Sequence, residues 1–162
     1  METYEYTEKV QDTRSTEQEY VKTVVSVHTP LDTQRIYVPG YGEGAVWLKA
    51  HYVTKSSATA KEYSDMEGYR LTRVTGYVEE NGVIEYNVDF DLLTAYCMDP
   101  KSRGDVSVQS FDLTGEEINF VRYPSYTAYV ANVAEAKLGA SLDYNFYGNS
   151  YTINAFLFGT PL

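Results

Sequence analysis

The residues best suited to contact a ligand gather around the glycine-rich stretch 39–44. Tyr37 and Tyr41 lie beside or within this stretch, and Trp47 and His51 follow it on one face of a strand-like run. Exposed aromatic rings next to a flexible loop can stack on sugar rings or pack against a partner protein. We therefore take Tyr37, Tyr41, Trp47 and His51 as candidate ligand-binding residues. The alternative is that the aromatic side chains belong to the core and His51 faces solvent.

Acidic side chains offer two other kinds of chemistry. Asp89, Asp91, Asp99 and Asp105 are close in sequence and would suit calcium if one loop brought their carboxylates together. Solvated aspartates at strand ends are more common, so we expect no metal and no other cofactor. Glu85 with Asp89 would suit a glycoside hydrolase, whose mechanism depends on the separation of two carboxyl groups.

The sequence carries none of the stronger catalytic signatures. It lacks a phosphate-binding glycine loop, a Gly-x-Ser-x-Gly elbow and a calcium-binding loop motif. His28 and His51 are not at the spacing of helical zinc ligands, and Cys97 is the single cysteine, in an apolar run. We expect Cys97 to be a buried structural residue. The sequence thus favours a non-catalytic role over an enzyme.

Charge narrows the choice of partners. The formal net charge is −10 and the pI is about 4.6, with only 13 Lys and Arg residues against 23 Asp and Glu. The basic residues are scattered, whereas a nucleic-acid-binding domain needs a basic face to neutralise phosphates. We expect no nucleic acid partner and no attraction to anionic membranes. No stretch approaches ~20 apolar residues, so we expect no transmembrane segment.

The remaining pattern is that of β-strands. Residues 20–28 and 45–54 are strand-like, the second with Val46, Leu48, Ala50 and Tyr52 alternating on one face. A shorter strand is expected at 35–38. High tyrosine content, with 17 Tyr in 162 residues, also suits pleated, half-buried surfaces.

Two hairpins are predicted. Asn81-Gly82 is a favoured type I′ pair and lies between strand-like runs at 69–79 and 83–90. Gly148-Asn149 separates alternating runs at 140–147 and 150–158. Further strands are expected at 92–98, 106–113 and 118–123.

Residues 126–138 fit either a helix or a strand, and their strand-rich surroundings favour a strand. Strands recurring at roughly ten-residue spacing indicate an all-β protein, an antiparallel β-sandwich. The alternatives are a β-barrel, or an α+β fold if residues 126–138 form a helix.

The domain organisation follows from polarity. Residues 1–19 are charge-dense and poor in apolar side chains, which predicts a flexible N-terminal arm or linker. Residues 20–162 are predicted to form a single β-rich domain, a size that supports its own core.

Together these features predict a non-catalytic, secreted or cell-surface β-sandwich module that binds a protein or a glycan. In composition the chain is similar to β-rich domains secreted by Gram-positive bacteria, which implies an extracellular or cell-surface location. The alternatives are a carboxylate-dependent glycan hydrolase and a structural subunit of a phage or pilus assembly. The sequence leaves the oligomeric state open.

Overall fold

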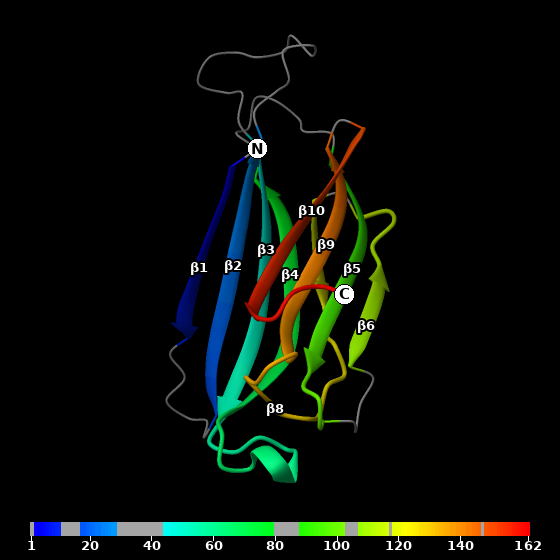
Figure 1. Cartoon of the computed structure of the whole chain (residues 1–162). Helices are drawn as coiled ribbons and strands as arrows, with labels where there is room; N and C mark the ends of the chain where they lie inside the picture. Colours follow the sequence, from blue (N-terminus) through cyan, green and yellow to red (C-terminus); the bar gives the residue numbers. More distant parts are fainter. Residues whose placement is uncertain are drawn as a thin grey trace.

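The protein is described by a computed structural model, which covers residues 2–10, 17–28, 44–79, 88–102, 107–116, 118–146 and 148–162. Within these residues the chain forms β-strands and no α-helix, with one 3₁₀ turn at Lys61–Tyr63 (Figure 1). The strands are β1 (Glu2–Val10), β2 (Gln18–His28), β3 (Gly44–Lys55), β4 (Gly68–Glu79), β5 (Val88–Met98), β6 (Val108–Asp112), β7 (Asn119–Arg122), β8 (Val130–Ala131), β9 (Lys137–Phe146) and β10 (Asn149–Phe158).

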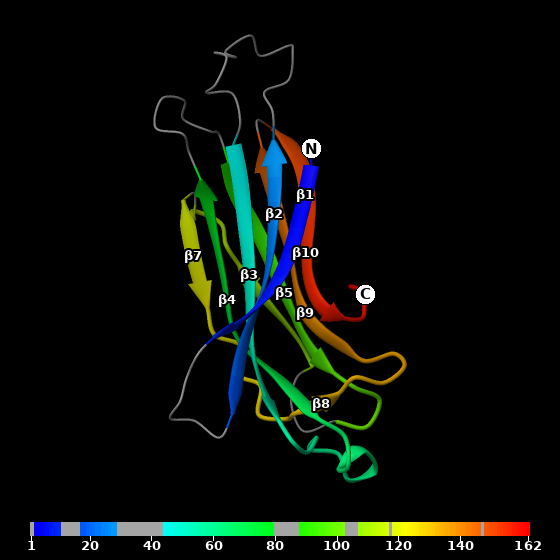
Figure 2. The ribbon, with the colours of Figure 1, turned by 90° about the vertical axis from the view of Figure 1, so that its left-hand side faces the viewer.

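The strands form two open antiparallel sheets that face each other (Figures 1 and 2). Sheet A has the order β1-β2-β3-β4-β7, with β8 also paired to β4, and sheet B has the order β10-β9-β5-β6. Neither sheet closes on itself. The prediction of an antiparallel β-sandwich is therefore confirmed, in preference to a barrel or an α+β fold.

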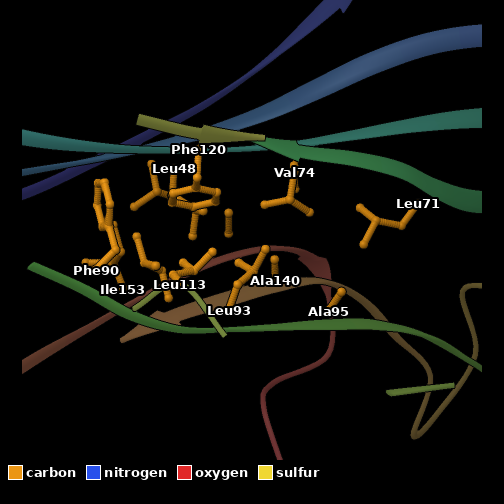
Figure 3. Packing of buried hydrophobic residues seen from close by; sticks show 14 of the residues in the cluster. Leu48, Leu71, Val74, Phe90, Leu93, Ala95, Leu113, Phe120, Ala140 and Ile153 are labelled. Atoms are coloured by element: carbon orange, nitrogen blue, oxygen red, sulfur yellow. The ribbon is translucent and has the colours of Figure 1, made fainter. Parts of the chain in front are cut away.

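Alternation along the strands builds the core. Sheet A turns Leu48, Val74 and Phe120 inward, and sheet B turns Phe90 and Leu93 toward them (Figure 3). These side chains are almost completely buried, and at about 25 cal/mol per Å² their apolar area is the main stabilising contribution. The alternation predicted for residues 45–54 is confirmed by β3.

Gly76 in β4 allows the tightest approach in this core. Gly76 and Phe120 are direct partners between β4 and β7, and both face inward. A Cβ atom at Gly76 would lie 2.3 Å from Cε1 of Phe120, well inside van der Waals contact. The absence of a side chain at Gly76 lets the Phe120 ring lie over β4 and meet Phe90 edge-on, with the ring centroids 5.0 Å apart.

The two predicted hairpins have different outcomes. The C-terminal hairpin between β9 and β10 is confirmed, and Gly148 has a φ of +79°. The predicted turn pair Gly148-Asn149 is wrong by one residue, because Asn149 already belongs to β10 and pairs with Phe146. The hairpin around Asn81-Gly82 is wrong in its strand pairing, because β4 belongs to sheet A and β5 to sheet B. The chain crosses between the sheets here, so that β4 and β5 bury apolar faces against each other; Asn81 and Gly82 lie outside the described residues.

Residues 126–138 are neither a helix nor one continuous strand. They contain the two-residue β8 and a turn in which Glu135 has a φ of +70° before β9 begins. The loop that contains Thr59 supplies hydrogen-bond partners to the backbone of Tyr129. The Thr59 N–H donates to the Tyr129 carbonyl, and the Tyr129 N–H donates to Thr59 Oγ1. Tertiary hydrogen bonds therefore override the local preference that sequence periodicity could detect.

The segment predicted as an N-terminal arm contains regular structure. Glu2–Val10 forms β1, which pairs antiparallel with β2 over its whole length, and β2 already begins at Gln18. Residues 11–16 and the predicted strand at 35–38 lie outside the described residues. The polar composition was misleading because residues 3–9 of β1 are exposed, so this edge strand depends on backbone pairing rather than on apolar burial.

We expect Gly76→Ala to destabilise the fold by about 1–3 kcal/mol, because the new methyl group must displace the Phe120 ring. Urea unfolding followed by circular dichroism measures the loss. Thr75→Ala, on the opposite face of β4, is the matched control and should lose less. Adding Phe120→Leu to Gly76→Ala should recover part of the loss, whereas additive losses from the two changes would contradict the predicted contact.

Candidate functional site

Trp47 lies on the outer face of sheet A, half-buried among polar and aromatic neighbours. Its indole stacks on Tyr77 of β4, with ring centroids 5.3 Å apart and planes within 8° of parallel. The indole N–H donates to Glu79 Oε2 at 2.8 Å, and Lys49 Nζ lies 5.8 Å from the Trp47 ring centroid. The predicted candidate Trp47 thus belongs to an ordered surface cluster rather than to the core.

Strand register extends this cluster across four strands. Tyr4 of β1 is opposite Val25 of β2, which is opposite Trp47 of β3, which is opposite Tyr77 of β4. Residues paired in this way share one face of the sheet. A second row runs beside the first and includes Tyr6, Thr23 and Lys49.

We call the side chains that cover this surface the aromatic face: Tyr4, Tyr6, Trp47, Lys49 and Tyr77. Tyr4 and Tyr6 are 55% and 41% exposed, which is high for large aromatic side chains. Partial burial and the proximity of Glu79 and Tyr6 raise the pKa of Tyr77. Val25 and Thr23 of the central β2 are buried although they point outward.

His51 lies on the same face of β3 as Trp47, two positions beyond Lys49. The residue is only 8% exposed, and its ring lies between Arg73 and Glu19. Arg73 Nη2 lies 3.1 Å from His51 Nδ1, and Glu19 Oε1 lies 3.5 Å from the same nitrogen. Burial and the Arg73 guanidinium lower the pKa of His51, while Glu19 opposes the change. The structure thus places this candidate in a charged cluster at the border of the aromatic face.

The charges on the outer face of sheet A balance locally. The strand register places Lys49, Arg70 and Arg73 on it together with Glu8, Glu19 and Glu79. The chain as a whole carries −10. The aromatic face is therefore a nearly neutral region on a strongly acidic molecule, which reduces electrostatic repulsion of an acidic partner there.

Sequence reasoning found part of this surface and missed the rest. Tyr37 and Tyr41, the other two candidates, lie outside the described residues, so the structure does not test them. Tyr4, Tyr6 and Tyr77 were missed. Alternation indicates which side of a strand each tyrosine occupies, but only the pairing of four strands brings the rings together.

The outer face of sheet B has a different character. One row across it runs through Asn154, Ser141, Thr94 and Ser110, and exposed Asp89 lies opposite Asn145. Neighbouring polar side chains form hydrogen bonds with each other; for example, Thr152 Oγ1 donates to Asp143 Oδ1 at 2.6 Å. Glu85, the proposed partner of Asp89 in a hydrolase, is outside the described residues.

A second polar cluster is buried between the sheets at the end of β2. The Tyr144 hydroxyl donates to Ser26 Oγ at 3.2 Å and lies 2.5 Å from His28 Nε2, and the His28 ring stacks on Phe146. Burial lowers the pKa of His28 to about 4 and raises the pKa of Tyr144 to about 12. Both groups are therefore neutral at physiological pH and anchor β2 to sheet B.

Asp99 is a structural carboxylate. Its Oδ1 accepts hydrogen bonds from the N–H groups of Lys101 and Ser102, and its Oδ2 accepts from the Ala131 N–H at 2.9 Å and from the Ser102 hydroxyl. The buried side chain thereby joins the loop after β5 to β8. Asp89 and Asp91 are exposed, Asp105 is outside the described residues, and no group of three potential metal ligands occurs within the described part of the chain.

Comparison with known proteins does not supply a function. No protein-family model matches the chain, and neither a curated protein nor a solved structure matches it. Within the residues that the structure covers, no helix has the length and apolar character needed to cross a bilayer.

We expect the stability of the protein to fall as the pH is lowered from about 6.5 to about 4, with His28 as one cause. The pKa of His28 is about 4 in the fold and near 6.5 when the chain unfolds, so the unfolded state binds more protons in this window. Urea unfolding measures the free energy of unfolding of the wild type and of His28→Phe at each pH. The difference between the two free energies should change between about pH 6.5 and about pH 4 and stay constant above about pH 6.5. A difference that is flat across the window would contradict the assigned role of His28.

We expect Asp99→Ala to destabilise the fold by about 2 kcal/mol or more, because it leaves buried N–H donors without an acceptor. Thermal and urea unfolding measure the loss. Asp89→Ala, which removes an exposed aspartate from β5, the strand that precedes the Asp99 loop, is the control and should have little effect. Equal effects of the two substitutions would show that the buried network around Asp99 contributes nothing.

Proposed function

We propose that this chain is a non-catalytic binding module, secreted or held at a cell surface, that recognises a partner protein through the aromatic face. The observation that carries the proposal is the ordered group of Tyr4, Tyr6, Trp47 and Tyr77 on one exterior surface. Aromatic and arginine side chains are enriched in protein interfaces and contribute most of their binding energy. The secreted or cell-surface location is supported by composition alone.

A protein partner fits this surface better than a glycan does. Trp47 and Tyr77 each turn one ring face toward the other, and Lys49 Nζ lies within 5.8 Å of both ring centroids. These contacts occupy ring surface on which a sugar would stack, while a protein can cover the whole group and pack against its edges. The indole N–H already has Glu79 as its acceptor, so covering the cluster leaves no unpaired donor on Trp47.

The chain provides its own probe for the test, because Trp47 is its only tryptophan. Labelled protein is applied to arrays of extracellular proteins and of glycans, and each hit is titrated while the Trp47 emission is recorded. We expect a protein hit that shifts the emission and whose affinity falls at least tenfold in Tyr77→Ala and in Lys49→Glu. Thr152→Ala on the outer face of sheet B is the control and should bind like the wild type.

Three results would overturn the proposal. One is a protein hit that these aromatic-face variants do not weaken. Another is specific binding to glycans alone, which would favour glycan recognition. The third is turnover of a glycan by the purified chain, which would restore the hydrolase hypothesis.

A further inference from the structure

The free edge of β1 is the least protected backbone in sheet A. Glu2–Val10 pairs with β2 at nine consecutive positions without a bulge, and no described strand lies on its other side (Figures 1 and 2). Such an edge presents a row of N–H and C=O groups, which proteins protect with proline, bulges or very short strands. β1 has none of these three features, so its backbone geometry suits the addition of another strand. Its charged side chains, which also hinder edge pairing, restrict the register in which a strand can be added.

β1 also buries little of its own side-chain surface. Residues 3–9 are all exposed, including Tyr4 and Tyr6, and only Val10 is half-buried. A strand exposed on both faces contributes little apolar burial to offset its ordering. A second strand on the free edge would supply hydrogen bonds and cover part of the two tyrosines.

The sequence of β1 complements itself in one antiparallel register. With Tyr6 on a two-fold axis, Tyr6 faces Tyr6 of the second copy, and Tyr4 faces Glu8. Glu5 then faces Thr7, and the remaining opposed pairs are Thr3 with Lys9 and Glu2 with Val10. Every residue of the strand has a partner, and no like charges are directly opposite.

Neighbouring registers fit less well. With the axis on Glu5, Glu5 would face Glu5 and Glu2 would face Glu8, which places like charges together. With the axis on Thr7, the charges are compatible, but Glu2 and Thr3 have no opposite residue within β1. Lys22 Nζ lies 3.4 Å from Glu5 Oε1 within the same copy in every register, so the Tyr6 register is preferred because it leaves no carboxylates directly opposite each other.

We propose that two copies of this chain associate in solution through β1, antiparallel, with Tyr6 on the two-fold axis. Sheet A then continues from one copy into the other. Because opposed residues share a face, the aromatic faces of the two copies lie on the same side of the joined sheet. The dimer does not depend on the proposed partner protein, and the two proposals are tested separately.

Charge reversal at matched positions tests the register. Sedimentation equilibrium should show a dimer of the wild type that tightens with added salt, because each copy carries −10. Tyr6→Lys places two ammonium groups against each other at the axis and should weaken the dimer at least tenfold. Tyr4→Lys, the same change two residues away on the same face, places its ammonium opposite Glu8 and should leave the dimer equal or tighter.

Disulfide trapping gives an independent readout. The wild-type cysteine, Cys97, is buried, so unchanged protein should give no covalent dimer under mild oxidation. Tyr6→Cys should cross-link with itself, because the two sulfurs would lie at the axis. Tyr4→Cys and Glu8→Cys should each cross-link poorly alone and efficiently when mixed.

A wild-type chain that stays monomeric at low and high salt, at the highest concentration attainable, would overturn the proposal. Equal weakening of the dimer by Tyr4→Lys and Tyr6→Lys would also overturn it. The same holds if Tyr4→Cys alone forms the disulfide-linked dimer as efficiently as Tyr6→Cys. Circular dichroism of each variant shows whether the fold is intact, and the proposal concerns only folded variants.

Discussion

The close packing of the two sheets is the constraint on which the rest of this molecule depends. Side chains alternate along each strand, so once Leu48 and Tyr52 face sheet B, Trp47, Lys49 and His51 must face outward. The inner layer is dense enough that Gly76 has no room for a methyl group beneath Phe120. The outer surface of sheet A is therefore determined by the interior as much as by its own residues.

The buried polar groups of Asp99, His28 and Tyr144 inside the sandwich are tolerated because each has hydrogen-bond partners. Asp99 receives backbone N–H groups from its own loop and from β8, and the Tyr126 hydroxyl lies 2.8 Å from the Ala95 carbonyl oxygen. His28 and Tyr144 join β2 to sheet B in their neutral forms. These contacts connect irregular segments and strand ends to the sheets. Apolar packing alone would leave the positions of those segments and ends poorly specified.

The surfaces available for association are those that the core does not use. Sheet A carries aromatic rings in two rows of residues, and β1 adds a backbone edge beside them. The strands that carry these two features differ in burial. The inner face of β3, which carries Trp47, is packed against sheet B, whereas both faces of the edge strand β1 are exposed. The two proposals therefore concern different parts of sheet A: the central strands for a partner protein and the β1 edge for a second copy.

The sequence by itself determined the all-β character, the inward face of β3, the burial of Cys97 and the C-terminal hairpin, because these follow from periodicity of two and from local turn chemistry. Tertiary structure decided the rest. Asn81-Gly82 is a favoured turn pair, yet β4 and β5 are not paired: β4 belongs to sheet A and β5 to sheet B, and both contribute apolar side chains to the core between the sheets. The polar segment before residue 11 became a strand because β2 supplied hydrogen-bond partners. The grouping of Tyr4, Tyr6, Trp47 and Tyr77 needed the register of four strands, which is fixed by long-range contacts that a local pattern does not contain.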